Sequence, residues 1–330
     1  MFFVTKAQTT RHAHTQQQLF HQIIRSFASS PATAPPFVRS PVQKYPLTPT
    51  RNVPSHIPRP PYARTGRVPP SVWLHQIALH TEDPVELRNA ARLARRVLDL
   101  ACSSVQPGMT SDEIDAIVHE AIVRHGAYPS PLNYEGFPKS VCTSINEVIC
   151  HGIPDLRPFQ YGDVVSLDVS CYLQGVHGDN CATILVGDDE EGSDLQLAPA
   201  RRLIQATKES LDAAIATCRP GSCLTSIGAA IQDVADSYGY QSVEKYRGHG
   251  IGTEFHCAPF VKHFRNHDYL RLQKGMVFTI EPMLTAGSAD CFEWDDQWTV
   301  ATSDGSLAAQ FEHTVYITDD GVEILTLPDE

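Results

Sequence analysis

Residues 165–186 constrain the fold most, because their sequence, VSLDVSCYLQGVHGDNCATILV, combines a buried β-hairpin pattern with two acidic side chains. Two apolar runs rich in β-branched residues flank a Gln174-Gly175 turn. Such a turn places Asp168 opposite Cys181, with Asp179 on the same face at the roughly 7–8 Å expected of a diagonal pair. A buried carboxylate is unfavourable unless a proton or a cation neutralises it. The two side chains are therefore either solvated on an exposed face or ligands of a bound cation.

The first 81 residues differ in composition from the rest of the chain. They contain no Asp or Glu, but nine of the 26 Lys and Arg and twelve of the 24 Pro. Residues 82–330 are left with 17 basic and 38 acidic residues, a formal charge of −21. Residues 1–30 are rich in hydroxyl side chains and carry apolar residues on one helical face, which is typical of an organellar transit peptide. The alternative is a basic arm for nucleic acid, but the acidic body would repel phosphate.

Residues 31–81, rich in Pro, predict an extended linker or a wrap over the domain surface. The folded domain is expected over 82–330. No run approaches the roughly 18–20 apolar residues of a membrane span. The nine cysteines form no C-x-x-C pair, so we expect reduced core residues and not a disulfide framework or a zinc ribbon.

Two helices are predicted at the start of this domain. Asp83 as N-cap and Pro84 at the first helical position indicate a helix over 83–105. Thr110 and Glu113 have the spacing of a capping box, which predicts the start of a second helix.

A shift of 113 residues maps this helix pair onto a second pair. The Pro-Gly break at 107–108 falls on the one at 220–221, and helices are expected over 200–218 and 224–239. Strand-like segments with a His-Gly-Ile triplet follow each pair. The pattern predicts a duplicated α/β unit with a cleft where the halves meet.

Polar residues also interrupt apolar strands in the second half. Glu281 ends the strand in GMVFTIEPML, Glu312 and His313 lie in AAQFEHTVYIT, and His249 and His256 lie in GHGIGTEFHCAP. Taken singly, a strand Glu is more often solvent-facing and a core His more often bonded to a carbonyl. Together, two Asp, two Glu and one His form a ligand set suited to two divalent metals that carboxylates bridge.

The most specific blocks are GFPKSVCTSINEVICHGIP, HGDNCATILVG, GHGIGTEFHCAP, FTIEPML and WTVATSDGSLAAQFEHT. They resemble the type 1 methionine aminopeptidases of metallopeptidase family M24, and the likeness runs from about Asp83 to the C-terminus. With an N-terminal leader and without a zinc-binding module, the chain is most similar to the mitochondrial form. The resemblance implies an α+β pita-bread fold, with two pseudo-symmetric α/β halves and an antiparallel sheet around a dinuclear metal site. Residues 82–330 would then be the catalytic domain.

The resemblance also implies the site residues. Two metals would be bound, with Asp179 and Glu312 bridging them, and a metal-bridging hydroxide would attack the first peptide bond. The implied metal ligands are Asp168, Asp179, His249, Glu281 and Glu312. The implied catalytic residues are His151, His256 and Glu281. The implied substrate-binding residues are Tyr134, Phe137, Cys142, His151, Phe255, His256 and Trp298.

The implied reaction is removal of N-terminal methionine, favouring a small second residue. The partners would be the N-termini of nascent or newly imported polypeptides, and the protein would bind no nucleic acid and have no membrane span. It would be a monomer in the mitochondrial matrix or, alternatively, in a plastid. The ligand types admit Co, Mn, Fe or Zn. Ser170, Asn180 and Phe137 depart from the family pattern without removing a ligand. An Xaa-Pro peptidase and a non-catalytic binding module of the same fold are the alternatives.

Overall fold

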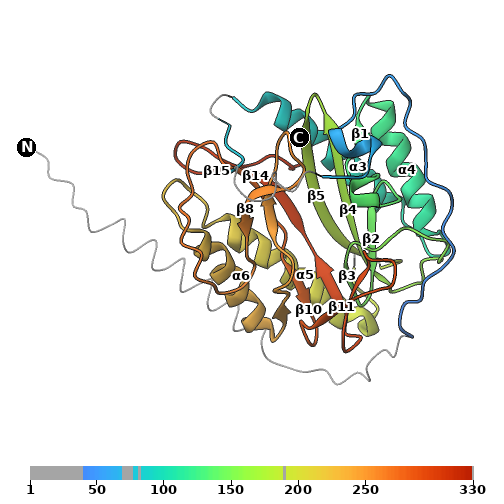
Figure 1. The fold of residues 1–330 in the computed structure, drawn as a ribbon. Coiled ribbons are helices and arrows are strands. Elements are labelled where there is room, and N and C mark those ends of the chain that lie inside the picture. The colour runs from blue at the N-terminus through green and yellow to red at the C-terminus, as the bar shows by residue number, and fades with distance from the viewer. Residues whose placement is uncertain (1–39, 69–76, 81–82, 189–190, 329–330) are drawn as a thin grey trace, which may run out of the picture. The chain divides into compact units, whose positions relative to one another are not determined.

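The computed structural model describes residues 40–68, 77–80, 83–188 and 191–328. The predicted transit peptide, residues 1–30, lies outside these ranges. The described residues belong to a unit that extends over Arg39–Glu330 and combines helices with antiparallel sheets (Figure 1). Among the described helices, none is long and apolar enough to cross a membrane.

Four α-helices occur in the described residues, in two pairs as the repeat predicts: α3 (Val85–Ser104), α4 (Ser111–Arg124), α5 (Ala198–Ile215) and α6 (Leu224–Tyr238). The capping box of α4 is confirmed, since Thr110 and Glu113 exchange side-chain to backbone hydrogen bonds of 3.2 and 2.7 Å. The N-cap predicted at Asp83 is wrong. Pro84 occupies that position, and the Asp83 carboxylate instead forms an ion pair with Arg88 one turn into the helix.

The main sheet has nine strands in the order β1-β4-β5-β14-β9-β7-β8, with β2 beside β4 and β15 beside β14. All of its pairings are antiparallel. Its strands are β1 (Tyr128–Pro129), β2 (Cys142–Ile145), β4 (Val164–Leu173), β5 (Val176–Leu185), β7 (Gly248–Gly250), β8 (Cys257–Val261), β9 (Val277–Ile280), β14 (Glu312–Ile317) and β15 (Val322–Ile324).

Two three-stranded sheets complete the fold, in the orders β13-β10-β6 and β11-β12-β3. Their strands are β3 (Val148–Cys150), β6 (Gln241–Ser242), β10 (Met283–Thr285), β11 (Cys291–Glu293), β12 (Val300–Thr302) and β13 (Ala308–Gln310). Short 3-10 turns lie at Pro61–Arg64, Tyr134–Gly136 and Leu195–Leu197.

The hairpin predicted from the sequence is β4–β5, and its predicted register is confirmed. Asp168 lies opposite Cys181. The Gln174-Gly175 turn has φ values of 53° and 89°, as a two-residue hairpin turn of the primed type requires. Asp179 lies opposite Ser170, so it shares a face of the sheet with Asp168.

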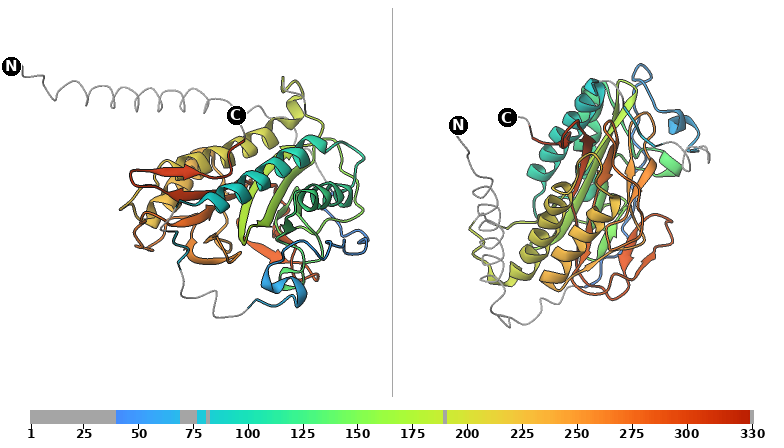
Figure 2. Two further views of the ribbon diagram at one scale, coloured as in Figure 1. Left: turned by 90° about the horizontal axis from the view of Figure 1, so that it is seen from above. Right: turned by 90° about the vertical axis from the view of Figure 1, so that its left-hand side faces the viewer.

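Each half of the molecule has its own apolar core. In the first half, α3 and α4 bury Leu93, Val97 and Ile114 against strand residues such as Leu167 of β4. In the second half, α5 and α6 bury residues such as Leu211 against β9 and β14. Helices α3, α5 and α6 lie on one face of the main sheet (Figure 2). The halves join where β5 pairs with β14. None of the nine cysteines, all within the described ranges, forms a disulfide, as predicted.

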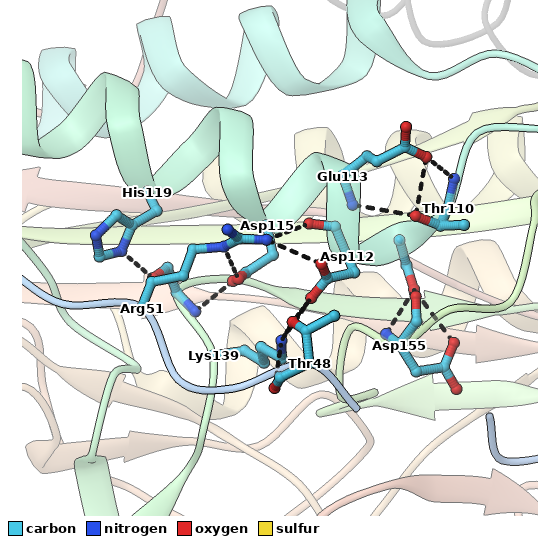
Figure 3. Close-up of polar contacts among 11 residues, drawn as sticks. Thr48, Arg51, Thr110, Asp112, Glu113, Asp115, His119, Lys139 and Asp155 are labelled. Carbon is cyan, nitrogen blue, oxygen red and sulfur yellow. Dashed lines mark hydrogen bonds and ion pairs between the residues drawn. The ribbon is translucent and has the colours of Figure 1, made fainter. Parts of the chain in front are cut away.

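Residues 40–68, here called the N-terminal strap, run along the body past α4 and include the 3-10 turn Pro61–Arg64 (blue in Figure 1). Arg51 donates to Asp115 and to Asp112, both at 2.9 Å. Lys139, whose side chain is fully buried, donates to Asp112 at 2.5 Å and to the Thr48 hydroxyl at 2.7 Å (Figure 3). The strap therefore belongs to the same compact unit as the body.

Replacement of Arg51 tests how much this anchor contributes. Arg51→Ala leaves the carboxylate of Asp115, whose side chain is fully buried, without its cation, and we expect the free energy of unfolding to fall by about 3 kcal/mol. Urea denaturation of the full chain measures it. The matched control is Arg67→Ala, an exposed arginine of the same strap, with a change within about 0.5 kcal/mol. Equal effects of the two variants would contradict a structural role for the ion pairs.

Candidate metal centre

A cavity of about 490 Å³ opens at the sheet, and all twelve residues that the sequence assigned to the site line it. They are Tyr134, Phe137, Cys142, His151, Asp168, Asp179, His249, Phe255, His256, Glu281, Trp298 and Glu312. Its size is in the range of small-molecule and cofactor sites. The sheet thus brings together residues that are up to 178 positions apart in the sequence, from Tyr134 to Glu312.

The five residues expected to bind metal come from five neighbouring strands. Asp168 is in β4, Asp179 in β5, Glu312 begins β14, Glu281 directly follows β9, and His249 is in β7. These strands are consecutive in the order of the main sheet. Because adjacent strands are about 4.8 Å apart, side chains at the same level of neighbouring strands converge on one region.

Three of these residues form a compact group. One potential ligand atom each from Asp179, His249 and Glu312 lies within 4.8 Å of the others. The His249 Nε2 atom is 3.7 Å from Asp179 Oδ2 and 3.6 Å from Glu281 Oε1. Asp168 lines the same cavity outside this group, and its Oδ1 atom is buried with no hydrogen-bond partner among the described residues.

Neighbouring hydroxyl and amide groups fix the orientation of the carboxylates. Ser170 donates to Asp179 at 2.8 Å, and Thr279 donates to Glu281 at 3.0 Å. Gln310 donates to the other oxygen of Glu281 at 3.4 Å. The sequence did not indicate Thr279 and Gln310. Thr279 could have been found, because it lies two positions before Glu281 and strand alternation places these two residues on one face.

Burial is the first cause of the raised pKa values of the four carboxylates. It raises the pKa of Asp179 to about 6. The pKa values of Asp168, Glu281 and Glu312 lie well above their usual range, because each is buried and repelled by Asp179. Four carboxylates cannot all be ionised here without a cation. The oxygen-rich donor set with one imidazole and the unpartnered Asp168 oxygen fit divalent metal.

The three histidines of the cavity are held neutral. Burial lowers the pKa of His151 and of His249 to about 4. Burial and the neighbouring imidazoles hold the pKa of His256 well below its usual range. The ring centroids of His249 and His256 are 4.1 Å apart. Neutral imidazoles can act as metal ligands or hydrogen-bonding groups at neutral pH.

Aromatic rings form the remaining walls. Phe137 packs edge-on against Trp298 at 5.1 Å, and Tyr134 packs edge-on against Phe255 at 5.1 Å. Cys142 lies opposite Asp168 across the β2–β4 pair, and burial raises the pKa of its thiol. The thiol is therefore a neutral, apolar part of the wall.

Several residues of the cavity were missed by sequence reasoning. The rim carries Glu135, Lys245 and Arg247. His177 stacks on Phe255 at 5.0 Å from behind. His177 stands two positions before Asp179 on the predicted strand, so alternation indicated that it points to the same face.

Comparison with known proteins shows clear relatives. The family description "Metallopeptidase family M24" matches residues 85–319. Methionine aminopeptidase 1D, chloroplastic/mitochondrial, of Arabidopsis thaliana is 50% identical over 281 residues, which cover 85% of this chain and 78% of the relative. Methionine aminopeptidase 1D, mitochondrial, of Homo sapiens is 46% identical over 280 residues, covering 84% and 81%.

Solved structures agree in fold. The methionine aminopeptidase of Rickettsia prowazekii is 45% identical, with a TM-score of 0.72 over 76% of this chain and 100% of that one. The prolidase of Pyrococcus furiosus is 21% identical, with a TM-score of 0.57 over 77% of this chain and 66% of that one, which shows a common fold alone. The α+β pita-bread fold expected from the sequence is confirmed.

The raised carboxylate pKa values predict how stability depends on pH. A carboxylate whose pKa is raised in the folded state stabilises the folded protein at low pH. This contribution is lost as the pH rises through the pKa of the folded state. Ordinary histidines, with a pKa of about 6.5, are almost wholly neutral in both states only above about pH 7.5, so the carboxylates are compared above that pH. We expect the melting temperature of chelator-treated protein to fall between about pH 7.5 and 9, and added Mn²⁺ to raise it most at the upper end.

Circular-dichroism melts with and without metal measure this dependence. Glu312→Gln removes one buried carboxylate, so the slope should decrease, whereas Glu120→Gln, at an exposed helix position, should leave it unchanged. A metal-free melting temperature that rises over the same range would contradict the assignment of these carboxylates as a repelling cluster.

Proposed function

The chain belongs to metallopeptidase family M24 and is a metallo-aminopeptidase, and we propose that it removes the N-terminal methionine of proteins, favouring a small second residue. One observation carries the proposal. Four carboxylates and a histidine from five neighbouring strands meet in a cavity walled by aromatic rings and a thiol. The acidic floor suits the cationic free N-terminus that an aminopeptidase must bind.

Two divalent ions would be held at this floor by Asp168, Asp179, His249, Glu281 and Glu312, and Asp179 and Glu312 would contribute to both. The donor set is compatible with Co, Mn, Fe or Zn. When bound, such ions lower the pKa of water and polarise the peptide carbonyl. Ser170, which orients Asp179, replaces the Thr that the family pattern favours and keeps a hydroxyl in place.

The chain's own residues supply proton transfer and charge stabilisation. We propose that Glu281, with its raised pKa, takes a proton from the attacking water and delivers it to the leaving amine. Hydrogen bonds from Thr279 and Gln310 hold its carboxylate in position. His256, a neutral imidazole beside His249, would donate to the carbonyl oxygen as negative charge develops there.

The methionine side chain is assigned to the aromatic part of the cavity. Tyr134, Phe137, Phe255 and Trp298, together with the Cys142 thiol, offer the soft apolar contacts that suit a thioether. His151 lies 6.0 Å from the Trp298 ring and 5.3 Å from the Tyr246 ring. We propose that this packed side of the cavity limits the second residue to a small side chain and places His151 near the new amine.

The relatives named mitochondrial or chloroplastic/mitochondrial support an organellar location. We propose the mitochondrial matrix, with a plastid as the alternative, and residues 1–30 as the transit peptide. The substrates would be N-termini of nascent or newly imported polypeptides. We further propose a monomer that binds no nucleic acid, in keeping with the acidic body of the chain.

Peptide hydrolysis by the full chain tests the function. With Mn²⁺, Co²⁺, Fe²⁺ or Zn²⁺ added, we expect release of methionine from Met-Ala-Ser, and little release from Met-Leu-Ser because the second side chain is too large. Chromatography of the products measures each rate. Cleavage of Ala-Pro-Ala instead would assign the chain to the Xaa-Pro peptidases, and no cleavage by folded protein with any metal would favour a binding module.

Asp179→Asn tests the ligand assignment. The amide preserves shape but removes the negative charge of a proposed bridging ligand, so kcat should fall by about a thousandfold or more. The bound metal, measured by elemental analysis, should fall with it, while the melting temperature of the metal-free protein is retained or rises, because one repelling charge is gone. Glu135→Gln, on the rim of the same cavity, is the control and should keep activity. Full turnover by Asp179→Asn would overturn the assignment.

A further inference from the structure

The side chain of Tyr62 brings the N-terminal strap against the wall of the substrate pocket. This tyrosine is 6% exposed, although it belongs to a segment that the sequence identifies only as Pro-rich. Its hydroxyl donates to the Ser130 carbonyl oxygen at 2.7 Å. Its ring packs edge-on against Tyr134, with the ring centroids 4.9 Å apart. Tyr62 therefore lies directly behind a residue of the pocket wall.

A second set of contacts links Tyr62 to Phe255 on the other wall. The Tyr62 ring is nearly parallel to the His177 ring at 6.1 Å, with an interplanar angle of 17°. His177 in turn stacks on Phe255 at 5.0 Å and 15°. Its Nδ1 atom is fixed by the Ser130 hydroxyl at 2.8 Å. Ser130 thus bonds both rings, which fixes His177 between the strap and the wall.

The two walls meet at His256. The ring centroid of Phe255 is 4.2 Å from that of His256, and the Tyr134 centroid is 4.9 Å away. A movement of either wall ring would therefore change the position of the imidazole. Buried side chains pack at crystal-like density, so loss of the Tyr62 ring leaves a cavity behind the two walls.

Hydrogen bonds on both sides of Tyr62 hold the strap against the body. Upstream, Arg51 and Thr48 are bound by the buried charges of Asp112, Asp115 and Lys139 (Figure 3). Immediately downstream of Tyr62, the Ala63 carbonyl oxygen accepts a hydrogen bond of 3.0 Å from Asn133. Asn133 directly precedes Tyr134, so the strap also holds the backbone of the pocket loop.

We propose that Tyr62 is a positioning residue of the methionine pocket, which holds Tyr134 directly and Phe255 through His177. The strap then supports the wall of the active site and is not only a spacer. This inference rests on the proposed function, because it assigns the supported rings to the methionine side chain. It predicts that removal of the Tyr62 ring weakens substrate binding without removing any group that touches the substrate.

The experiment compares Tyr62→Ala with Ile57→Ala in the full chain loaded with Mn²⁺. Ile57 is a matched control, since it is a buried strap residue, 3% exposed, that packs in a different apolar cluster, with Val53, Tyr128 and Leu132. Both variants should lower the melting temperature. Tyr62→Ala should also raise KM for Met-Ala-Ser about tenfold, or roughly 1.4 kcal/mol, with a smaller change in kcat. Ile57→Ala should leave KM unchanged.

Tyr62→Phe keeps the ring and loses only the bond to Ser130, so it should restore KM to near the wild-type value. Equal KM values for Tyr62→Ala and Ile57→Ala would overturn the proposal. Nuclear magnetic resonance of labelled histidine rings gives a second readout that does not depend on turnover. Tyr62→Ala should shift the His177 and His256 resonances, whereas Ile57→Ala should not, and unshifted resonances in Tyr62→Ala would also overturn it.

The two proposals fail in distinguishable ways. If the wild-type protein cleaves no methionyl peptide, the proposed function fails, and the histidine resonances still decide whether Tyr62 positions the cavity rings. If the wild-type protein cleaves Met-Ala-Ser and Tyr62→Ala behaves as Ile57→Ala does, the function stands and the positioning role fails.

Discussion

The repulsion among four buried carboxylates is the constraint on which the rest of this structure depends. Burial raises the pKa of each, and Asp179 adds repulsion to the other three. The sheet holds them together nevertheless, because its strand order brings β4, β5, β14 and β9 side by side. The helices on the opposite face supply the apolar burial that stabilises this arrangement. The cost of the uncompensated charge is what a divalent cation would relieve.

The local part of this arrangement could be predicted from sequence. A two-residue turn fixes the register of a hairpin, so the Gln174-Gly175 turn was enough to place Asp168 opposite Cys181. The capping box of Thr110 and Glu113 could also be predicted from the sequence, because both partners lie within one helical turn. The N-cap at Asp83 failed since a nearby cation competed for the carboxylate. Pattern alone does not reveal such competition.

The non-local part could not be predicted by the same means. No spacing rule places Glu281 and Glu312 beside a hairpin more than 90 residues upstream, and only the family resemblance grouped them with it. The partners of the strap were hidden for the same reason. The composition of residues 31–81 indicated a linker or a wrap, but the acidic partners of Arg51 lie more than 60 positions away. The roles of Tyr62 and His177 depend on ring stacking, which leaves no periodic signal.

The place of the strap in the sequence, between leader and body, limits how the chain can be matured. The backbone of Val42 donates to Glu147, and Tyr45 donates to Asp155, so bonds to the body begin almost where the described residues do. A processing peptidase that cut at the start of the helical domain would discard the anchors and Tyr62 together. The mature N-terminus must lie upstream of Val42 for the body to keep them. If residues 1–30 are removed as a transit peptide, as proposed, the strap that follows them in sequence must be retained as part of the enzyme.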